Sequence, residues 1–262
     1  MDSKENAAYW EANAETWTQL SRAGHDVYRD GQNTPAFLAM LPPLVGLRGL
    51  DIGCGEGENT RRVARLGARM NAIDIAPTFV RHAQAMETKQ PLGIEYELGD
   101  GAALSFGDAS FDFVTAFMSL MDMPYLPQAM AEIKRVLRPG GFVQASILHP
   151  CFCPPYRKPV QAADGSIRAI EVARYFDRAD GEIETWCFST IPLLQKLTVR
   201  PFQIPRFHRT LSEWFDTIYS TGLVLEQLGE PNPTDDELRA YPKLADTRVA
   251  PLFLHFRARK PA

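Results

Sequence analysis

The chain has 262 residues, a net charge of −4 and a hydrophobic content of 45%, which is ordinary for a globular protein and suggests one domain with an insertion. The negative balance argues against an extended nucleic-acid or anionic membrane surface, and no apolar run is long enough to span a bilayer. The first residues do not form a signal peptide, and the four cysteines are scattered along the chain. We therefore expect a cytoplasmic protein without a disulfide framework, a nucleic-acid partner or membrane insertion.

Residues 1–45 are predicted to form a helical cap ahead of the first strand. The segment Tyr9–Trp17 places aromatic and apolar residues at helical spacing. A second short helix is predicted from Thr34 to Leu41, because Pro35 suits a first turn and the following Pro42-Pro43 would stop the helix.

The most informative stretch is Leu50-Asp-Ile-Gly-Cys-Gly-Glu-Gly57. Its apolar run stops at Gly53 and a helical pattern begins at Glu58, which predicts a strand, a tight glycine turn and a helix N-terminus. Glycines accept positive φ and let a ligand lie against bare peptide, and a helix N-terminus offers unpaired N–H groups. A second predicted strand, Arg69–Asp74, ends in an acid that could accept hydrogen bonds from a ribose diol. Together the two strand ends indicate a cofactor that contains a nucleoside.

The spacing of the glycines argues against a dinucleotide. The dinucleotide fingerprint is G-x-G-x-x-G/A, and its third position here would be Glu58, whose carboxylate would repel a pyrophosphate. A further acid inside the turn, Glu56, suits a ligand that has no phosphate and has a positive end. An NAD-linked oxidoreductase on a similar sheet is therefore an unfavoured alternative.

Residues 46–148 alternate predicted strands and helices, which indicates a parallel sheet with right-handed crossovers. Further strands are expected at 94–98, 111–117 and 142–148, with helices opening at Pro77 and Pro127. The segment at 111–117 is apolar on both faces, as a central parallel strand should be. Residues 210–262 return to this pattern, with a helix at Leu211–Tyr219 and final strands at Leu223–Leu228 and Pro251–Arg257.

Residues 149–209 break this pattern and are predicted to form an inserted lid. The segment is rich in proline and aromatic residues, and its apolar content is too high for disorder. Two β-prone pieces flank Asp180-Gly181, which predicts a hairpin turn at that dipeptide.

From about Ala36 to Lys260, outside the insertion, the chain resembles the class I S-adenosylmethionine (SAM) dependent methyltransferases. The motifs that carry the resemblance are, in order, the glycine stretch, Asp74, Gly99-Asp100, Phe111-Asp-Phe113, Leu137-Arg-Pro-Gly-Gly141 and His208–Trp214. They are similar to the type 11, ubiquinone-biosynthesis-like branch, which acts on small molecules. The resemblance implies an α/β, Rossmann-like, doubly wound fold whose mostly parallel seven-stranded sheet contains one antiparallel strand. It divides the chain into a cap (1–45), a SAM-binding core (46–148), an acceptor-side lid (149–209) and a completion of the core (210–262).

Ligands of such sheets bind at the carboxyl ends of the strands. With SAM as the cofactor, the glycine turn would contact the methionine part, Asp74 the ribose hydroxyls and Asp100 the adenine amino group. The two acids could instead serve only as helix and turn residues. Related enzymes place an arginine ahead of this region to hold the SAM carboxylate, and its forked guanidinium suits that role. The candidate cofactor-binding residues are Arg29, Gly53, Cys54, Gly55, Gly57, Asp74, Ile75, Asp100, Gly101, Ala102, Phe117 and Met118.

A hydroxyl or amine acceptor would be helped by a general base. His149 ends the fifth predicted strand and His208 precedes the last helix, so either could face the acceptor pocket. Further candidates after the fourth strand are Asp122 and Tyr125. Basic residues of the lid would suit a flat or partly anionic acceptor, although a solvated surface explains them equally well; they are Arg157, Lys158, Arg174 and Arg178.

We therefore expect a SAM-dependent methyltransferase acting on a small molecule, with O-methylation favoured over C- or N-methylation. A SAM-binding module without catalysis is the alternative from a different class of protein. No metal is expected, because the Cys151-x-Cys153 pair has no second pair at zinc spacing. The sequence names neither the acceptor nor the oligomeric state.

Overall fold

The computed structural model describes residues 1–262 and is built on a seven-stranded sheet with the order β10-β11-β5-β4-β1-β2-β3. The strands are β1 Arg48–Ile52, β2 Arg69–Asp74, β3 Glu95–Leu98, β4 Phe111–Phe117, β5 Leu137–Leu148, β10 Val224–Gly229 and β11 Phe253–Arg259. Every pairing is parallel except those of β11, which lies antiparallel between β5 and β10. The predicted α/β fold with one antiparallel strand is confirmed.

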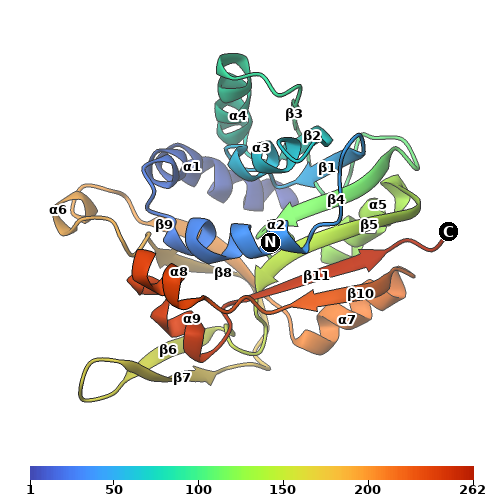
Figure 1. The fold of residues 1–262 in the computed structure, drawn as a ribbon. Helices are drawn as coiled ribbons and strands as arrows, with labels where there is room; N and C mark the ends of the chain where they lie inside the picture. Colours follow the sequence, from blue (N-terminus) through green and yellow to red (C-terminus); the bar gives the residue numbers. More distant parts are fainter.

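Helices cover both faces of this sheet (Figure 1). The longer ones are α1 Ser3–Arg22, α2 Thr34–Met40, α3 Glu58–Ala64, α4 Pro77–Lys89, α5 Leu126–Val136 and α7 Leu211–Ser220. Shorter helical segments are η1 Arg29–Asn33, η2 Leu120–Asp122, α6 Leu193–Lys196, α8 Asp235–Ala240, η3 Pro242–Leu244 and α9 Ala245–Val249. None of them combines the length and the apolar character that a membrane span requires.

The central strand β4 explains why two apolar cores form. Its side chains alternate between the faces, so that Val114 and Ala116 join the core under α5 and α7, while Phe113 and Phe117 join the core under α2, α3 and α4. A strand buried on both sides is mostly apolar, and the buried polar residue of β4, Thr115, donates its hydroxyl hydrogen to Asp51 of β1. The sheet is therefore fixed at its middle, and the carboxyl ends of its strands are held in one place.

The insertion segment, residues 149–209, contains two antiparallel strand pairs outside the main sheet. Its strands are β6 Tyr156–Gln161, β7 Ile167–Ala173, β8 Ala179–Trp186 and β9 Phe202–His208, with β6 paired to β7 and β8 to β9. The predicted hairpin turn at Asp180-Gly181 is wrong. These residues lie inside β8 at a shift of register, and Gly181 adopts φ +98°, as in a β-bulge built on a glycine.

Helix α1 holds the second strand pair against the rest of the molecule. The ring of Trp17 packs on Trp186, Phe188 and Phe202, with ring centroids 5.5, 5.0 and 4.8 Å away. The amide of Asn13 also exchanges hydrogen bonds with the backbone of Gln203, at 2.8 and 3.2 Å. The N-terminal helix and the insertion segment therefore meet over the carboxyl ends of the strands.

Candidate functional site

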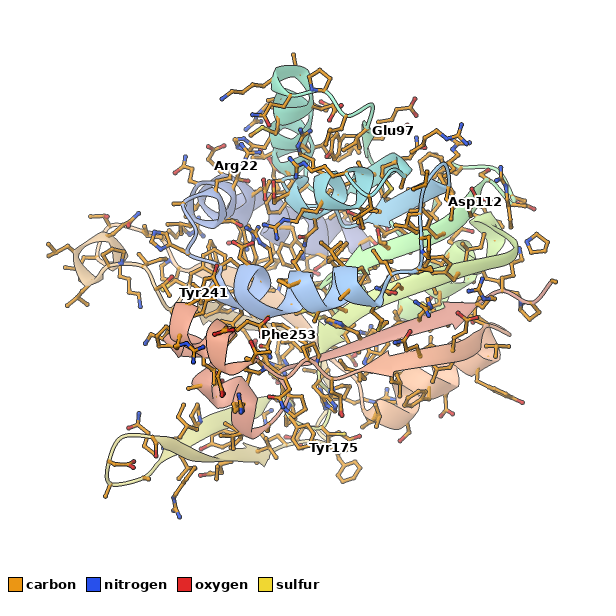
Figure 2. The ribbon with its side chains drawn as sticks, in the orientation of Figure 1. Arg22, Glu97, Asp112, Tyr175, Tyr241 and Phe253 are labelled. Atoms are coloured by element: carbon orange, nitrogen blue, oxygen red, sulfur yellow. The ribbon has the colours of Figure 1, made fainter.

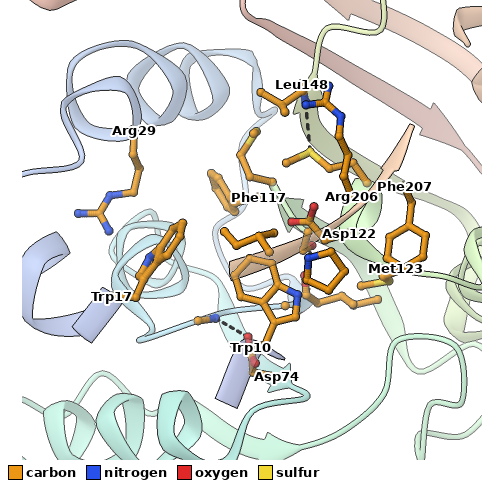
Figure 3. Close-up of a pocket in the computed structure, with 18 of the residues that line it drawn as sticks. Trp10, Trp17, Arg29, Asp74, Phe117, Asp122, Met123, Leu148, Arg206 and Phe207 are labelled. Carbon is orange, nitrogen blue, oxygen red and sulfur yellow. Dashed lines mark hydrogen bonds between the residues drawn. The ribbon is translucent and has the colours of Figure 1, made fainter. Parts of the chain in front are cut away.

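A cavity of about 470 Å³ opens at the carboxyl ends of β1, β2, β4 and β5, within the size range of small-molecule sites. Helix α1, the glycine turn and the strand pair β8–β9 also line it. Figure 3 shows Arg29 at the left of the cavity, Asp74 at the bottom beside Trp10, and Asp122, Arg206 and Phe207 at the right. Because these groups differ in chemistry, the cavity has two distinct ends.

The glycine turn after β1 uses its glycines for different purposes. Gly53 has φ +73°, and a Cβ added there would lie 2.4 Å from Ser119 Cβ, so this position must stay bare. Gly55 has φ +56° and faces open space, since an added Cβ would meet no atom within 4 Å. Both line the cavity, as does the buried side chain of Cys54.

Gly57 differs from its predicted role. It does not line the cavity, and a Cβ there would lie 2.8 Å from the hydroxyl of Tyr96. Its φ of +89° and this close contact show that Gly57 lets α3 start tightly against Tyr96 of β3. The third glycine of the turn is therefore needed for packing, and only the first two border the ligand space.

Asp74 ends β2 with its carboxylate turned back onto the glycine turn. Its Oδ2 accepts a hydrogen bond from the Gly55 N–H at 2.8 Å, and its Oδ1 accepts one from Ala76 N–H at 2.9 Å. Burial raises the pKa of Asp74 to about 6, although the backbone donors act in the opposite direction. Since each carboxylate oxygen can accept a second bond, Asp74 can hold the turn and still receive donors from a ligand.

The end of β3 supplies a second acid to the cavity. Asp100 Oδ1 accepts a hydrogen bond from the Ala102 N–H at 2.9 Å, whereas its Oδ2 has no partner in the chain. Asp100, Gly101 and Ile75 line the cavity, but Ala102 does not. Gly101 has no room for a side chain, because an added Cβ would lie 2.8 Å from Ile52. Ala102 therefore contributes its amide to the acid and lies outside the ligand space.

Met118 shows unusual backbone geometry where β4 ends. It has φ +53° without being glycine, and such strain concentrates at functional sites. Its N–H donates to the Ser146 carbonyl at 2.9 Å, which holds the conformation from the neighbouring strand. Phe117 and Met118 both line the cavity, between the two ends described above.

Arg29 lines the cavity inside a cluster of acids. Its Nε and one terminal nitrogen donate to the two oxygens of Asp30, at 3.0 and 3.1 Å. The other terminal nitrogen lies 3.3 Å from Glu56 Oε1, and Arg22 pairs with the same carboxylate at 3.0 Å. The acid that was expected to meet the positive end of a ligand is therefore already paired with two arginines.

Sequence reasoning missed Asp26, which lines the cavity beside this cluster. Its Oδ1 accepts a hydrogen bond from the Arg29 N–H at 3.2 Å, and burial raises its pKa to about 6. No arginine or lysine forms an ion pair with it. The only signal in the sequence is an acid three residues ahead of Arg29, which is too common to single out.

The two candidate histidines have different surroundings. His149 lies outside the cavity lining, and both ring nitrogens are used: Nε2–H donates to Glu230 at 2.9 Å, and Nδ1 accepts from the Cys151 N–H at 3.2 Å. With no free nitrogen, His149 anchors the start of the insertion segment. His208 lines the cavity, and its Nε2–H donates to the Tyr175 carbonyl at 2.8 Å. Burial lowers the pKa of His208, so its ring is neutral at pH 7.

The basic residues named for the lid do not face the cavity. None of them lines it, and Arg157, Arg174 and Arg178 pair with Asp246, Asp177 and Glu213 elsewhere. Tyr125 is also absent from the lining. The arginines that do face the cavity from the insertion side are Arg206 and Arg209, which the sequence did not single out.

Comparisons with known proteins agree with this geometry. Residues 50–145 match the family described as Methyltransferase domain. The ubiquinone biosynthesis O-methyltransferase of Nitrosococcus oceani is 34% identical over 163 residues, which cover 59% of this chain and 67% of that protein. The chain belongs to the class I SAM-dependent methyltransferases. A crystal structure of a SAM-dependent methyltransferase from Mesorhizobium loti gives a TM-score of 0.68 at 28% identity, covering 86% of this chain and 96% of that one.

Several other curated relatives match over shorter stretches. The O-methyltransferase cnsE of Penicillium expansum is 38% identical over 117 residues, 42% of each chain. An uncharacterized protein of Mycobacterium tuberculosis is 34% identical over 98 residues, 37% of this chain and 36% of that protein. The chain therefore spans less than half the length of the first curated relatives.

The residues that line the cavity fit SAM as a cofactor. SAM carries a sulfonium and an ammonium against one carboxylate, so it has a net positive charge. The cavity is lined by eight carboxylates and only three guanidinium groups, which favours a cation. The open space at Gly55 leaves room for a ligand against the backbone. The free Oδ2 of Asp100 adds an unused hydrogen-bond acceptor.

Proposed function

We propose that this protein transfers the methyl group of SAM to a small-molecule acceptor, with O-methylation as the reaction. The observation that carries the proposal is a single cavity whose one end has the acids and bare glycines of a nucleoside site and whose other end is walled by aromatic and polar side chains. Relatives named as O-methyltransferases support the choice of oxygen as the methylated atom.

At the cofactor end, we assign the ribose hydroxyls to Asp74 and the adenine amino group to the free Oδ2 of Asp100, with Ile75 beside the ring. The backbone at Gly53 and Gly55 would receive the methionine part. Arg29 would bind the carboxylate and Asp26 the ammonium, because their charges are opposite to those groups and both line the cavity. Phe117 and Met118 would border the reacting centre.

When bound, SAM supplies an electrophilic methyl group on a sulfonium. The chain has to orient the acceptor oxygen, exclude water and receive a proton. We propose that residues 149–209 act as an acceptor-side lid, since β8 and β9 line the cavity opposite the glycine turn. We also propose a cytoplasmic location, based on the scattered cysteines.

Titration of the protein with SAM and S-adenosylhomocysteine by isothermal calorimetry tests the proposal. Both ligands should bind, and Asp74→Ala should weaken binding about 10- to 100-fold, because a hydrogen bond to a charged group contributes about 1.5–3 kcal/mol. Binding of both ligands without transfer to any acceptor would point instead to the non-catalytic module.

Glu97→Gln is the matched control for Asp74→Ala. Glu97 is exposed on the neighbouring strand β3, away from the cavity lining, and Figure 2 shows it at the outer edge of the molecule. This variant removes one negative charge without touching the site, so it should bind both ligands like the unmodified protein. Unchanged binding by Asp74→Ala would remove the ribose assignment.

A further inference from the structure

The loop between β8 and β9 carries three exposed leucines on the short helix α6. Leu193, Leu194 and Leu197 are 76%, 81% and 77% exposed. Figure 1 shows α6 at the left edge of the molecule, apart from the other helices. A single exposed leucine is ordinary on a protein surface, whereas a group of them in one place marks a surface that another molecule covers. The leucines of α6 therefore call for a partner.

The segments on both sides of α6 are firmly packed. Phe188 and Ile191, ahead of the helix, and Phe202, after it, are 5%, 3% and 1% exposed. All three belong to one apolar cluster with Leu20 of α1. The core beside α6 is therefore filled by its flanking residues, while the leucines of the helix itself remain in contact with solvent.

Residues 191–201, which we call the α6 tip, carry positive charge and no negative charge. The chain has 32 aspartates and glutamates, yet none lies between residues 185 and 212. The charged residues of the tip are Lys196 and Arg200, and neither forms an ion pair with an acid of the chain. The ammonium group of Lys196 contacts only the Ser189 carbonyl, at 3.3 Å, and Arg200 is exposed. The net charge of −4 for the whole chain therefore hides a local cationic tip.

Exposed leucines beside unpaired positive charges fit a membrane surface that contains anionic lipids. The lipid phosphates attract Lys196 and Arg200, and the acyl chains just below them take up apolar side chains. A nucleic acid would use the two charges but leave the leucines in water. A second copy of the chain would bring two cationic tips together, and their charges would repel each other.

We propose that the α6 tip docks this protein onto the surface of a membrane that contains anionic lipids. The three leucines enter the boundary between head groups and acyl chains, and the two basic side chains lie among the phosphates. The docking is peripheral, because a helix of four residues is far too short to cross a bilayer. It does not depend on the proposed function.

The tip is continuous with one wall of the cavity. Trp186, Phe188 and Ser189, shortly before the tip, line the cavity, and so does Ile204 shortly after it. Because these residues belong to the same packed segment as α6, a docked protein holds this wall of the cavity close to the lipid.

Co-sedimentation of the full-length protein with lipid vesicles tests the docking. The vesicles contain phosphatidylcholine with about 30% phosphatidylglycerol, and the matched vesicles contain phosphatidylcholine alone. The protein should bind the anionic vesicles about 25-fold more tightly at low salt, since each basic residue near an anionic surface contributes about fivefold. This preference should shrink as the salt concentration rises, because the attraction between charges is screened.

Two variants separate the apolar contribution from the charged one. Replacing the leucines together, with Leu193→Ser, Leu194→Ser and Leu197→Ser, should weaken binding to both kinds of vesicle by about tenfold for each leucine. Replacing the charges together, with Lys196→Ser and Arg200→Ser, should remove the preference for the anionic vesicles and leave the weak binding to neutral ones. Both variants should keep the urea midpoint of the unmodified protein, since they alter residues outside the packed core.

Tyr219→Ser is the matched control for the loss of exposed apolar surface. Tyr219 is 83% exposed on α7, which Figure 1 shows on the opposite side of the molecule from α6. This variant should bind both kinds of vesicle like the unmodified protein. Hydrogen–deuterium exchange should locate the contact, with vesicles protecting residues 191–201 and leaving the hairpin β6–β7 unchanged.

Four results would overturn the docking proposal. They are no binding to anionic vesicles at low salt, a triple leucine variant that binds like the unmodified protein, an equal loss of binding in Tyr219→Ser, and protection outside the tip. Sedimentation velocity covers the rival occupant. A dimer that the triple leucine variant converts to monomers, without binding of vesicles, would show that the tip joins two copies of the chain. The SAM titration, by contrast, decides the proposed function.

Discussion

Asp26, which is half-buried, and Asp74, which is buried, are the two cavity-lining acids assigned to SAM, and desolvation raises the pKa of each to about 6. Both are therefore partly protonated near pH 6 in the ligand-free protein. SAM has a net positive charge and binds best when they are ionised, so binding releases protons. The affinity for SAM should then be constant above pH 7 and fall as the pH drops from 6.5 to 5.

Calorimetric titration at pH 7.5 and pH 5 measures this effect. One carboxyl with a pKa of about 6 weakens binding about tenfold over this interval, and two weaken it further. S-adenosylhomocysteine keeps the ammonium and the ribose that are assigned to Asp26 and Asp74, so its affinity should fall by a similar factor. An affinity that is the same at both pH values would show that these acids do not contact the ligand.

At the scale of single elements, the sequence alone predicts those features that depend on residues close together in the chain. Gly53 and Gly55 were found because a strand, a turn and a helix start follow one another within a few residues. Asn6 of the cavity lining could not be found, because its amide meets Asp122, which is 116 residues away, only after α1 has docked. The pairing of β8 with β9 across α6 was equally hidden, since Asp180-Gly181 reads locally as a turn and in the fold is a bulge.

Helices α7 and α8 each begin with a threonine N-cap, so the two helix starts can be compared directly. Thr210 and Thr234 each accept a hydrogen bond from the N–H of a glutamate three residues on, at 3.3 and 3.2 Å. Helix α7 buries Trp214 in the core, whereas α8 buries no residue.

Thr210→Ala should therefore lower the free energy of unfolding by about 0.5–2 kcal/mol, the usual cost of losing an N-cap. Thr234→Ala should cost clearly less, because α8 can fray without exposing the core. Urea unfolding followed by circular dichroism measures both. Equal losses would mean that α8 unfolds together with the core.

For the whole molecule, a buried ion pair joins the insertion segment to the C-terminal part of the chain. Arg157 on β6 lies 2.7 Å from Asp246 on α9, and their side chains are 12% and 7% exposed. Tyr28, near the N-terminus, donates a hydrogen bond to the same carboxylate at 3.1 Å. Figure 1 shows the hairpin β6–β7 extending below α9, so this contact ties it to the main body.

Asp246→Ala should destabilise the protein by about 3–5 kcal/mol, because it leaves the buried Arg157 charge without its counter-ion. Two guanidinium nitrogens of Arg157 already lack partners, so no other acceptor is at hand to replace the carboxylate. Replacing both residues, with Arg157→Met and Asp246→Ala, should recover part of the loss, since the unpaired charge is then gone. The exposed pair Arg174–Asp177 in the same segment is the matched control, and Asp177→Ala should leave the urea midpoint unchanged. A double variant as unstable as Asp246→Ala would show that Asp246 acts through Tyr28 and the packing of α9 rather than through the ion pair.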